Sequence, residues 1–379
     1  NLERVERIRT ELNLPVATLL DTKGPEIRIK DFTNGRIELK KDQTFTLTTR
    51  DVEGDSTMVS INYAGLPKDV SVGTKILIDD GLIGFEVVSL TDTDIICKAL
   101  NDGPLSNRKS VNVPGIKLNM DYISPKDYDD LVFGCKEKVD YVAASFARNK
   151  QDMLDLRKVL DDNGGKSIAI IAKIENMEGV ENVDDILDIA DGIMVARGDL
   201  GVEVDFELLP MIQKALIKKC IYRGKLVVTA TQMLDSMTKN PRPTRAEVTD
   251  IANAIYYRTD ALMLSGETAY GKYPIEAVKT MTKIAAQAEK DKSQENNIKI
   301  PLVPGSDDVT AFLAKQAVKA TDMLNIKAII TDSFSGRTAR NLAAFRGKYP
   351  VLAICYKEKT MRHLALSYGV EAIYMPEKA

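Results

Sequence analysis

The chain has 379 residues, of which 44% are hydrophobic and 28% are charged, a size and composition typical of a globular protein with two or three domains. Its formal net charge of −3 gives no basic field for nucleic acid or an anionic membrane surface, so an anionic ligand has to be bound by local groups. No apolar run is long enough to span a bilayer, and no signal peptide is visible at the start.

Short apolar runs alternate with amphipathic helical patterns along much of the chain. Strands are expected within residues 15–24, 140–147, 167–176, 191–201, 226–233 and 260–268. Helices are expected between them, at residues 125–138, 150–162, 207–222 and 245–256. This alternation predicts βα units and a parallel sheet. Several runs have charged or hydroxyl residues at the C-terminal end of the strand, where α/β folds and (β/α)8 barrels build their sites.

A different pattern interrupts this rhythm between residues 27 and 115. Alternating apolar positions, an Asn34–Gly35 hairpin signal and breaks at Gly73 and Gly81 predict an inserted β domain. Past residue 295 a polar linker is expected, followed by a smaller α/β segment with strands at 327–332 and 350–356. The predicted domains are a catalytic (β/α) domain at 1–26 and 116–294, a β lid at 27–115, and an incomplete C-terminal α/β domain at 305–379.

The cysteines and the single histidine limit the chemistry. The four cysteines have neither metal-site nor CxxC spacing, which predicts reduced thiols in a cytoplasmic protein; they are Cys97, Cys135, Cys220 and Cys355. His363 is expected on a solvated helix face. A histidine general base or a histidine metal site is therefore not expected.

An ammonium and a carboxylate follow a run that otherwise reads as a buried strand. Lys173 and Glu175 are two residues apart, so they share one face at the end of that strand. Burying both requires compensation, either as a structural ion pair or by a ligand. The next strand ends in Gly198, which allows close approach of a ligand, and Asp199. Two carboxylates suit Mg²⁺, and the adjacent lysine suits a phosphorylated or carboxylated substrate.

Hydroxyl residues follow two other expected strands. Thr231 and Ser145 stand at strand ends, and singly each is more typical of a backbone cap than of a catalyst. Two further polar segments need no function. Residues 79–81 read as an ordinary hairpin turn, and Thr244 reads as a helix N-cap with Glu247 three residues later.

The segment DTKGPEIR leads from the first expected strand into the insert. Asp21 and Thr22 offer oxygen ligands before a Gly–Pro turn, and Arg28 follows at the entry to the inserted domain. These residue types suit cation and phosphate binding at a domain hinge, although hinge ion pairs would give the same pattern. Lys109 stands before the return hinge, in what reads as a solvated basic loop.

Taken together, these segments resemble the pyruvate kinase family. IAIIAKIENMEGV is similar to that family's active-site signature. The other matching segments occur in the family's order along nearly the whole chain: DTKGPEIR, IDDGLI, VNVPG, GIMVARGDLG, TATQMLDSM, NPRPTRAE and MLSGETA. The resemblance implies a (β/α)8 TIM barrel whose first two strands are missing here, an inserted β-barrel domain, and a C-terminal α/β domain of effector type.

The resemblance implies phosphoryl transfer from phosphoenolpyruvate to ADP, giving pyruvate and ATP in glycolysis. By this resemblance Lys173 stabilises the migrating phosphoryl group, and Glu175 and Asp199 hold Mg²⁺. The backbone of Gly198 contacts substrate, and Thr231 lies near the enolate. Ser145 is included among the substrate-binding residues.

Further sites are implied only by the resemblance. Asp21 and Thr22 match part of a K⁺ site, and Glu26 is the residue type of potassium-dependent members. Arg28 and Lys109 match nucleotide phosphate contacts made as the lid closes. A phosphate-holding effector loop is implied at Ser333, Ser335, Gly336 and Thr338. A homotetramer in the cytoplasm, with a sugar phosphate as effector, is also implied.

Two substitutions depart from the family pattern. Ser110 replaces a glycine, and Arg258 stands where a glycine is usual, at a position where a positive φ would favour glycine. The chain also lacks the family's first two strands and the end of its C-terminal domain. Two alternatives therefore stay open: a Mg²⁺-dependent pyruvate aldolase or lyase on the same barrel, and a fragment that binds ligand without turnover.

Overall fold

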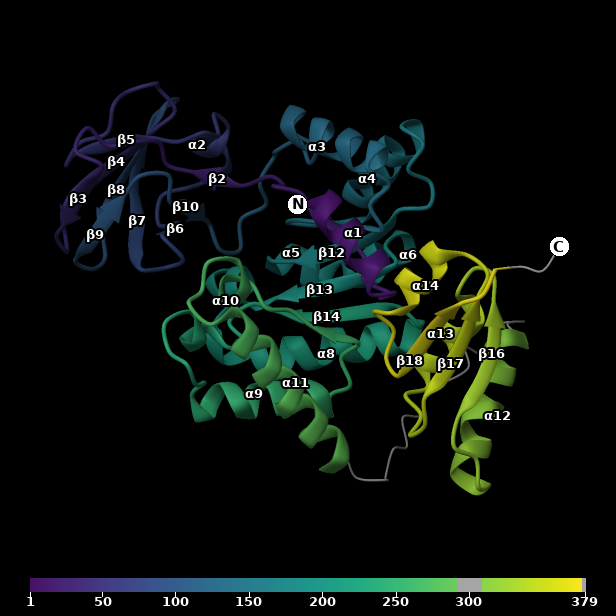
Figure 1. The fold of residues 1–379 in the computed structure, drawn as a ribbon. Coiled ribbons are helices and arrows are strands. Elements are labelled where there is room, and N and C mark those ends of the chain that lie inside the picture. Colours follow the sequence, from purple (N-terminus) through teal and green to yellow (C-terminus); the bar gives the residue numbers. More distant parts are fainter. Residues whose placement is uncertain (292–308, 377–379) are drawn as a thin grey trace.

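The computed structural model describes residues 1–291 and 309–376, and its centre is a six-stranded parallel sheet (Figure 1). The strands, in their order across the sheet, are β1 (Leu19–Asp21), β11 (Tyr141–Ala144), β12 (Ala169–Ile174), β13 (Gly192–Ala196), β14 (Leu226–Ala230) and β15 (Ala261–Leu262). Each of the six expected strands is present, and all neighbours pair in parallel. The sheet is the incomplete barrel that the sequence predicted.

Helices cover the outer face of this sheet. The longer ones are α3 (Pro125–Lys136), α4 (Lys150–Asp162), α8 (Leu209–Arg223), α9 (Arg245–Tyr256) and α11 (Pro274–Asp291). Shorter elements are α1 (Leu2–Glu11), α5 (Met177–Glu181), α6 (Val183–Ile189), α7 (Arg197–Glu203), η1 (Phe206–Leu208), η2 (Asp235–Thr238) and α10 (Gly266–Ala269). The predicted N-cap of α9 is confirmed, because Thr244 and Glu247 form a reciprocal capping box.

Alternation along the strands divides the barrel core into two layers. Val142, Ile170 and Ile193 face the helices in one large buried cluster. Ile171 and Met194, one residue further along their strands, belong to the cluster inside the sheet. Each fully buried side chain of this kind contributes about 1.5–3 kcal/mol, so the strand ends are held by a rigid frame.

The lid is a separate β domain between β1 and α3. Its main sheet has the order β2-β10-β6-β7-β8-β4-β5, with β3 and β9 paired apart from it. The elements are β2 (Ile27–Arg28), β3 (Arg36–Leu39), β4 (Thr44–Thr48), β5 (Met58–Ser60), α2 (Leu66–Asp69), β6 (Lys75–Ile78), β7 (Ile83–Leu90), β8 (Asp94–Ala99), β9 (Gly103–Ser106) and β10 (Ser110–Asn112). The hairpin prediction at Asn34–Gly35 was wrong. Gly35 does turn the chain, but the following strand pairs with β9, because a turn signal does not select a distant partner.

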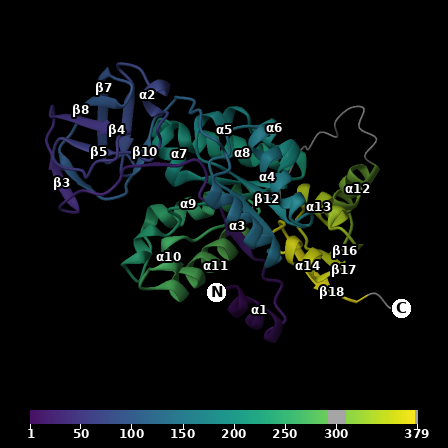
Figure 2. The ribbon, with the colours of Figure 1, turned by 90° about the horizontal axis from the view of Figure 1, so that it is seen from above.

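The C-terminal segment has its own parallel sheet and lies on the opposite side of the barrel from the lid (Figure 2). It contains α12 (Val309–Met323), β16 (Ile329–Ser333), α13 (Arg337–Ala344), β17 (Val351–Cys355), α14 (Glu358–Leu364) and β18 (Val370–Tyr374), with strand order β16-β17-β18. The two strands expected here are confirmed. The predicted linker and the domain bounds at 294 and 305 lie outside the described residues.

The expectation for His363 was wrong. Its ring packs 4.9 Å from the ring of Tyr141, and its Nε2 lies 2.9 Å from the carbonyl oxygen of Asp140. The Tyr141 hydroxyl donates to the His363 carbonyl at 2.7 Å, and burial lowers the pKa of the imidazole. The helix face that looked solvated therefore docks the C-terminal segment on the base of the barrel.

The structure also describes the cysteines and the two positions that depart from the family pattern. The four cysteines are free, and three of them are buried. Arg258 has φ +66°, so this position does have the conformation that favours glycine. Ser110 lies in β10, opposite Arg28 of β2. Among residues 1–291 and 309–376, no helix is both long and apolar enough to cross a membrane.

Candidate active site

Lys173 joins three strand ends in one cluster. Its Nζ lies 3.1 Å from Glu175 Oε1, 3.3 Å from Asp21 Oδ1 and 2.9 Å from Ser145 Oγ. These partners follow or end β12, β1 and β11, so the C-terminal edge of the sheet brings together residues that are distant in sequence. Although burial lowers it, the pKa of Lys173 is raised overall by Glu175 and Asp21. The ammonium therefore remains charged.

Glu175 is the most buried carboxylate of this cluster. Its side chain is 1% exposed, and the backbone N–H of Phe146 donates to Oε2 at 2.6 Å. Burial, opposed by Lys173 and reinforced by Asp199, raises the pKa of Glu175 to about 7. Phe146 has φ +52°, an uncommon conformation for a bulky residue. A strained backbone thus supplies the donor that holds this carboxylate.

Asp199 adds a second buried carboxylate from the first turn of α7. It shares a hydrogen bond with Glu175, and burial raises its pKa. Two carboxylates in such contact repel each other unless a proton or a cation neutralises them. Asp21 contributes a third carboxylate that is 59% exposed, and Lys173 is the ammonium paired with both Asp21 and Glu175. The cluster therefore has an excess of negative charge.

The donor set at Glu175 and Asp199 fits Mg²⁺. Within the described part of the chain, no group of three or more His, Cys, Asp or Glu residues is placed so that it could hold a metal ion. A site at Glu175 and Asp199 would therefore have two protein ligands. Mg²⁺ is commonly bound by one or two protein carboxylates and completes its octahedron with water and substrate oxygens. The two carboxylates are adjacent and their pKa values are raised, so their ionised forms are disfavoured. A bound Mg²⁺ would stabilise those ionised forms.

Thr231 and Gly198 meet beside this cluster. Thr231 has φ +65°, its Oγ1 accepts from the Gly198 N–H at 2.7 Å, and it donates to the Ala230 carbonyl at 2.7 Å. A Cβ on Gly198 would lie 3.4 Å from that hydroxyl oxygen. Glycine here therefore keeps the backbone N–H close to the strand end, where a substrate oxygen could compete for it.

Thr22 and Ser145 tie β1 to β11. The Thr22 hydroxyl donates to the Ala143 carbonyl at 3.2 Å and accepts from the Ser145 N–H at 3.1 Å. Ser145 Oγ donates to Asp21 Oδ1 at 3.2 Å. The Thr22 hydroxyl is thus engaged between strands, while Ser145 belongs to the Lys173 cluster.

Arg28 and Lys109 lie on the neighbouring lid segments at β2 and β10. Arg28 pairs with Glu26 at 2.5 Å and donates to the Arg108 carbonyl at 2.7 Å. Lys109 Nζ lies 2.8 Å from Asp79 Oδ1. The structure therefore brings these two cations together within the lid, each with a carboxylate partner there, rather than in the Lys173 cluster.

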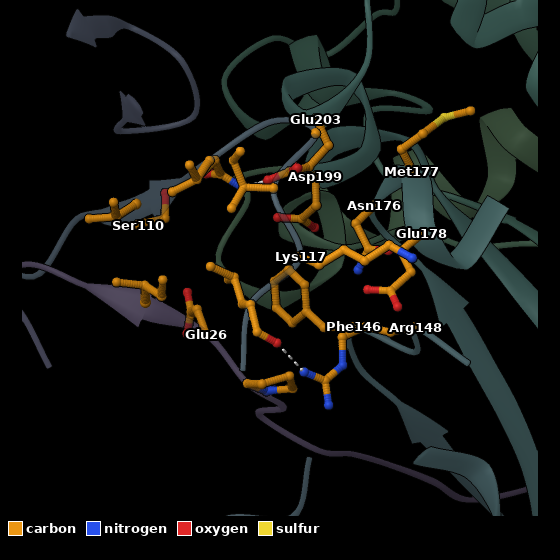
Figure 3. A pocket seen from close by; sticks show the side chains of 18 of the residues that line it. Glu26, Ser110, Lys117, Phe146, Arg148, Asn176, Met177, Glu178, Asp199 and Glu203 are labelled. Atoms are coloured by element: carbon orange, nitrogen blue, oxygen red, sulfur yellow. Dashed lines mark hydrogen bonds between the residues drawn. The ribbon is translucent and has the colours of Figure 1, made fainter. Parts of the chain in front are cut away.

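A cavity of about 150 Å³ separates the lid from the barrel (Figure 3). Glu26 and Ser110 line it from the lid, and Phe146, Asp199 and Glu203 line it from the barrel. The sequence analysis missed the contacts that bridge this gap. Asn112 Nδ2 donates to Glu203 Oε1 at 2.8 Å, which connects β10 to the end of α7. Asn112 stands within the matched segment VNVPG, so that motif was the available signal.

Arg148 was also missed. Its guanidinium donates to the carbonyls of Leu118 and Met120 at 3.1 and 3.0 Å and pairs with Asp152 at 2.9 Å. Figure 3 shows Arg148 beside the cavity. Arg148 thereby fixes the returning lid connection to α4.

The turn at residues 79–81 has more contacts than an ordinary hairpin. Asp79, Asp80 and Gly81 have φ values of +57°, +54° and +83° and connect β6 to β7. A Cβ on Gly81 would lie 3.6 Å from Val202 in α7, and the charge of Asp80 contributes to the raised pKa of Asp199. The tip of this lid hairpin therefore lies against the helix that supplies Asp199.

The predicted effector loop precedes α13. Ser333 Oγ accepts from the Gly336 N–H at 3.0 Å, and Gly336 has φ +85°. Ser335 follows β16, and its carbonyl accepts from Arg340 at 3.2 Å; Thr338 lies in the first turn of α13. Lys357 Nζ lies 3.8 Å from the centre of the Phe334 ring. Hydroxyls, a helix N-terminus and two cations thus surround one loop.

Comparisons with known proteins agree along nearly the whole chain. A family model described as "Pyruvate kinase, barrel domain" matches residues 1–278, and one described as "Pyruvate kinase, alpha/beta domain" matches residues 312–379. A pyruvate kinase of Clostridium acetobutylicum is 49% identical over 97% of this chain and 78% of its own length. One of Geobacillus stearothermophilus is 49% identical over 94% of this chain and 61% of its length. The crystal structure of a pyruvate kinase from Cryptosporidium parvum has a TM-score of 0.94 and 41% identity, covering 99% of this chain and 78% of that one.

Proposed function

We propose that the Lys173 cluster transfers a phosphoryl group from phosphoenolpyruvate to ADP, because the chain belongs to the pyruvate kinase family, whose members carry out this reaction. The observation that carries the proposal is the ammonium of Lys173 among Asp21, Glu175 and Ser145 at three strand ends. Phosphoryl transfer depends mainly on positioning and charge stabilisation, which such a cluster can supply.

Glu175 and Asp199 would hold Mg²⁺. The ion, when bound, supplies positive charge that neutralises and orients substrate oxygens. Lys173 has three donors and a pKa that keeps it charged. It would stabilise the negative charge on the phosphoryl group as that group moves between the two oxygens, because a preorganised charge in a buried site is worth more than one in water.

The enolate end of the substrate would lie near Thr231 and Gly198. Loss of the phosphoryl group leaves enolpyruvate, whose methylene carbon takes up a proton to give pyruvate. The Thr231 hydroxyl would pass on that proton and regain one from solvent. The Gly198 N–H, which donates to this hydroxyl at 2.7 Å, would exchange that contact for a substrate oxygen.

Cation and nucleotide sites complete the proposal. Asp21 and the carbonyl of Thr22 would bind K⁺, since the Thr22 hydroxyl is already engaged. Equal activity in K⁺ and in tetraalkylammonium buffer would contradict this K⁺ site.

Arg28 and Lys109 would exchange their carboxylate partners for nucleotide phosphates. Replacing both with methionine should raise the KM for ADP and leave the KM for phosphoenolpyruvate unchanged.

The loop before α13 would bind a phosphorylated effector through Ser333, Ser335, Gly336 and Thr338. Hydroxyls and backbone N–H groups at a helix N-terminus suit a phosphate, and Arg340 lies beside Ser335. A sugar-phosphate titration that activates wild type and Ser335→Glu equally would contradict this site.

A homotetramer in the cytoplasm also belongs to the proposal, and sedimentation of the purified enzyme tests the tetramer.

The metal assignment can be tested directly. In Asp199→Asn, loss of one carboxylate should raise the Mg²⁺ concentration needed for half-maximal turnover by roughly 10–100-fold, on the scale seen when groups that tune a metal site are lost. The control is Asp191→Asn at the other end of the sheet, where Asp191 accepts from the Ile170 N–H at 2.9 Å. An unchanged Mg²⁺ dependence in Asp199→Asn would contradict the assignment. Pyruvate formation without ADP would indicate a lyase instead.

A further inference from the structure

Arg197 lies directly before the two residues of α7 that belong to the site, but its side chain turns away from them. The residue is 8% exposed. Its Nε donates to the Ala230 carbonyl at 3.2 Å, and one terminal nitrogen donates to the Thr231 carbonyl at 2.7 Å. The other terminal nitrogen pairs with Asp250 of α9 at 2.5 Å. The guanidinium thus holds the end of β14.

Thr231 is strained at this point. Its φ of +65° and the φ of +52° at Gln232 put two consecutive non-glycine residues in the left-handed region. Such a conformation is strained for a non-glycine residue, and more so for a β-branched one, so the surroundings must maintain it. Arg197 and Gly198, adjacent in sequence, hold the carbonyl and the hydroxyl of Thr231 respectively.

We propose that Arg197 is a positioning residue for the protonation of the enolate, acting by holding Thr231 in its left-handed conformation. The inference rests on the role proposed above for Thr231. Without the guanidinium, the carbonyls of Ala230 and Thr231 each lose one donor, and the turn can relax towards an ordinary φ. The hydroxyl then moves away from the C–H bond that it has to help form.

The planar fork of arginine is what this arrangement needs. Nε and a terminal nitrogen reach two successive carbonyls while the remaining nitrogen pairs with Asp250. A lysine could keep the buried charge and the pairing with Asp250, but one ammonium on a flexible stem does not reproduce the fixed geometry. Arg197→Lys should therefore fold and still misplace Thr231.

The matched control is Arg157, which makes the same kinds of contact outside the site. It donates to the carbonyls of Ile168 and Gly165, both at 2.8 Å, and pairs with Asp161 at 2.9 Å. These residues lie at the N-terminal side of β12. Arg157→Met therefore removes a carbonyl-binding guanidinium without touching the strand ends that carry the cluster.

The experiment separates proton transfer from phosphoryl transfer. Each variant enzyme is incubated with pyruvate, ATP and Mg²⁺ in D₂O, and loss of methyl protons from pyruvate is followed by NMR alongside ordinary turnover. Arg197→Lys and Arg197→Met should slow exchange and turnover together by roughly 10–100-fold, the scale for a small misplacement of a reacting group. The KM for phosphoenolpyruvate should change by only a few-fold, and Arg157→Met should exchange at the wild-type rate.

Normal exchange in Arg197→Lys would overturn the inference, as would an equal slowing in Arg157→Met. Thr231→Val distinguishes this failure from that of the proposed function. If Thr231→Val exchanges slowly and Arg197→Lys normally, the positioning role fails and the role of Thr231 stands. If Thr231→Val exchanges normally, the proposed role of Thr231 fails, and the positioning inference fails with it.

Discussion

Strand β11 has a buried charged cluster at each end, and the two clusters have opposite balances of charge. Before the strand, Asp140 accepts from the Thr18 N–H at 2.9 Å and from Arg362 at 2.9 Å, and it also pairs with Arg9. Burial alone would raise the pKa of Asp140, but these donors lower it overall. After the strand, Ser145 joins a cluster in which burial raises the pKa values of Glu175 and Asp199.

The comparison separates a structural cluster from a binding cluster. Asp140 carries one negative charge and pairs with two arginines, so its charge is neutralised within the chain. These pairs connect α1, the barrel and α14. The carboxylates around Lys173 have fewer positive partners than are needed to neutralise their charge. A buried excess of charge is costly, and perturbed pKa values of this kind concentrate at functional sites. We therefore expect mutations at the first end to change stability and mutations at the second to change turnover.

The largest effect is expected at Lys173. Lys173→Met should lower the rate of phosphoryl transfer by roughly 10²–10³-fold or more, because one preorganised charge is lost. Binding of Mg²⁺ and phosphoenolpyruvate should stay within a few-fold, since Glu175 and Asp199 remain. Single-turnover kinetics and calorimetric binding measure the two quantities separately.

If Lys173 only neutralised Glu175, the outcome would be the reverse. The variant would leave a buried carboxylate unpaired, at a cost of about 3–5 kcal/mol in stability. A Lys173→Met enzyme that melts far below wild type, yet turns over normally while folded, would show that the cluster after β11 is structural, like the one before it. That result would contradict the catalytic role of Lys173.

At the other end, Asp140→Asn should act on stability. Removing the charge leaves Arg9 and Arg362 without their shared carboxylate, at a cost of about 3 kcal/mol, the lower end for breaking a buried pair. The loss should appear in the urea midpoint at pH 7, with kcat unchanged. Asp31→Asn, which removes an exposed partner of Arg108, should leave the midpoint unchanged.

The same residue predicts a pH dependence. The pKa of Asp140 is lower in the folded chain than in the unfolded chain, so the unfolded state binds more protons in the acid range. The stability that Asp140 contributes is therefore complete above its unfolded pKa of about 3.9 and is lost as the pH falls through the folded value. The difference in unfolding free energy between wild type and Asp140→Asn should shrink over that range, and a constant difference would contradict the assignment.

The smallest effect is expected at Ser145. Its hydroxyl accepts from Lys173 at 2.9 Å and donates to Asp21 at 3.2 Å, so it orients the ammonium without supplying charge. Ser145→Ala should lower kcat by roughly 2–10-fold, the equivalent of one hydrogen bond. Ser60→Ala in the lid removes a buried hydroxyl bound to the Arg50 carbonyl and should leave kcat unchanged. An equal fall in both variants would indicate general destabilisation.

Several features could be predicted from the sequence because they depend on near neighbours in the chain. Alternating apolar runs indicated the six strands of the sheet, and their order of strand and helix indicated parallel pairing. The spacing of Lys173 and Glu175 put both on one face, and they are in contact. The capping box at Thr244 and Glu247 formed as expected. In these last two cases the partners are two or three residues apart, so local geometry is sufficient.

Contacts between distant segments were decided by the tertiary structure. Arg197 holds a carbonyl 34 residues away, Asn112 reaches Glu203 across 91 residues, and His363 packs on Tyr141 rather than facing solvent. A sequence pattern records which face of an element is apolar or charged, but not which other element covers it. That choice depends on how the lid, barrel and C-terminal segment pack, because burial and charge balance are properties of the assembled fold.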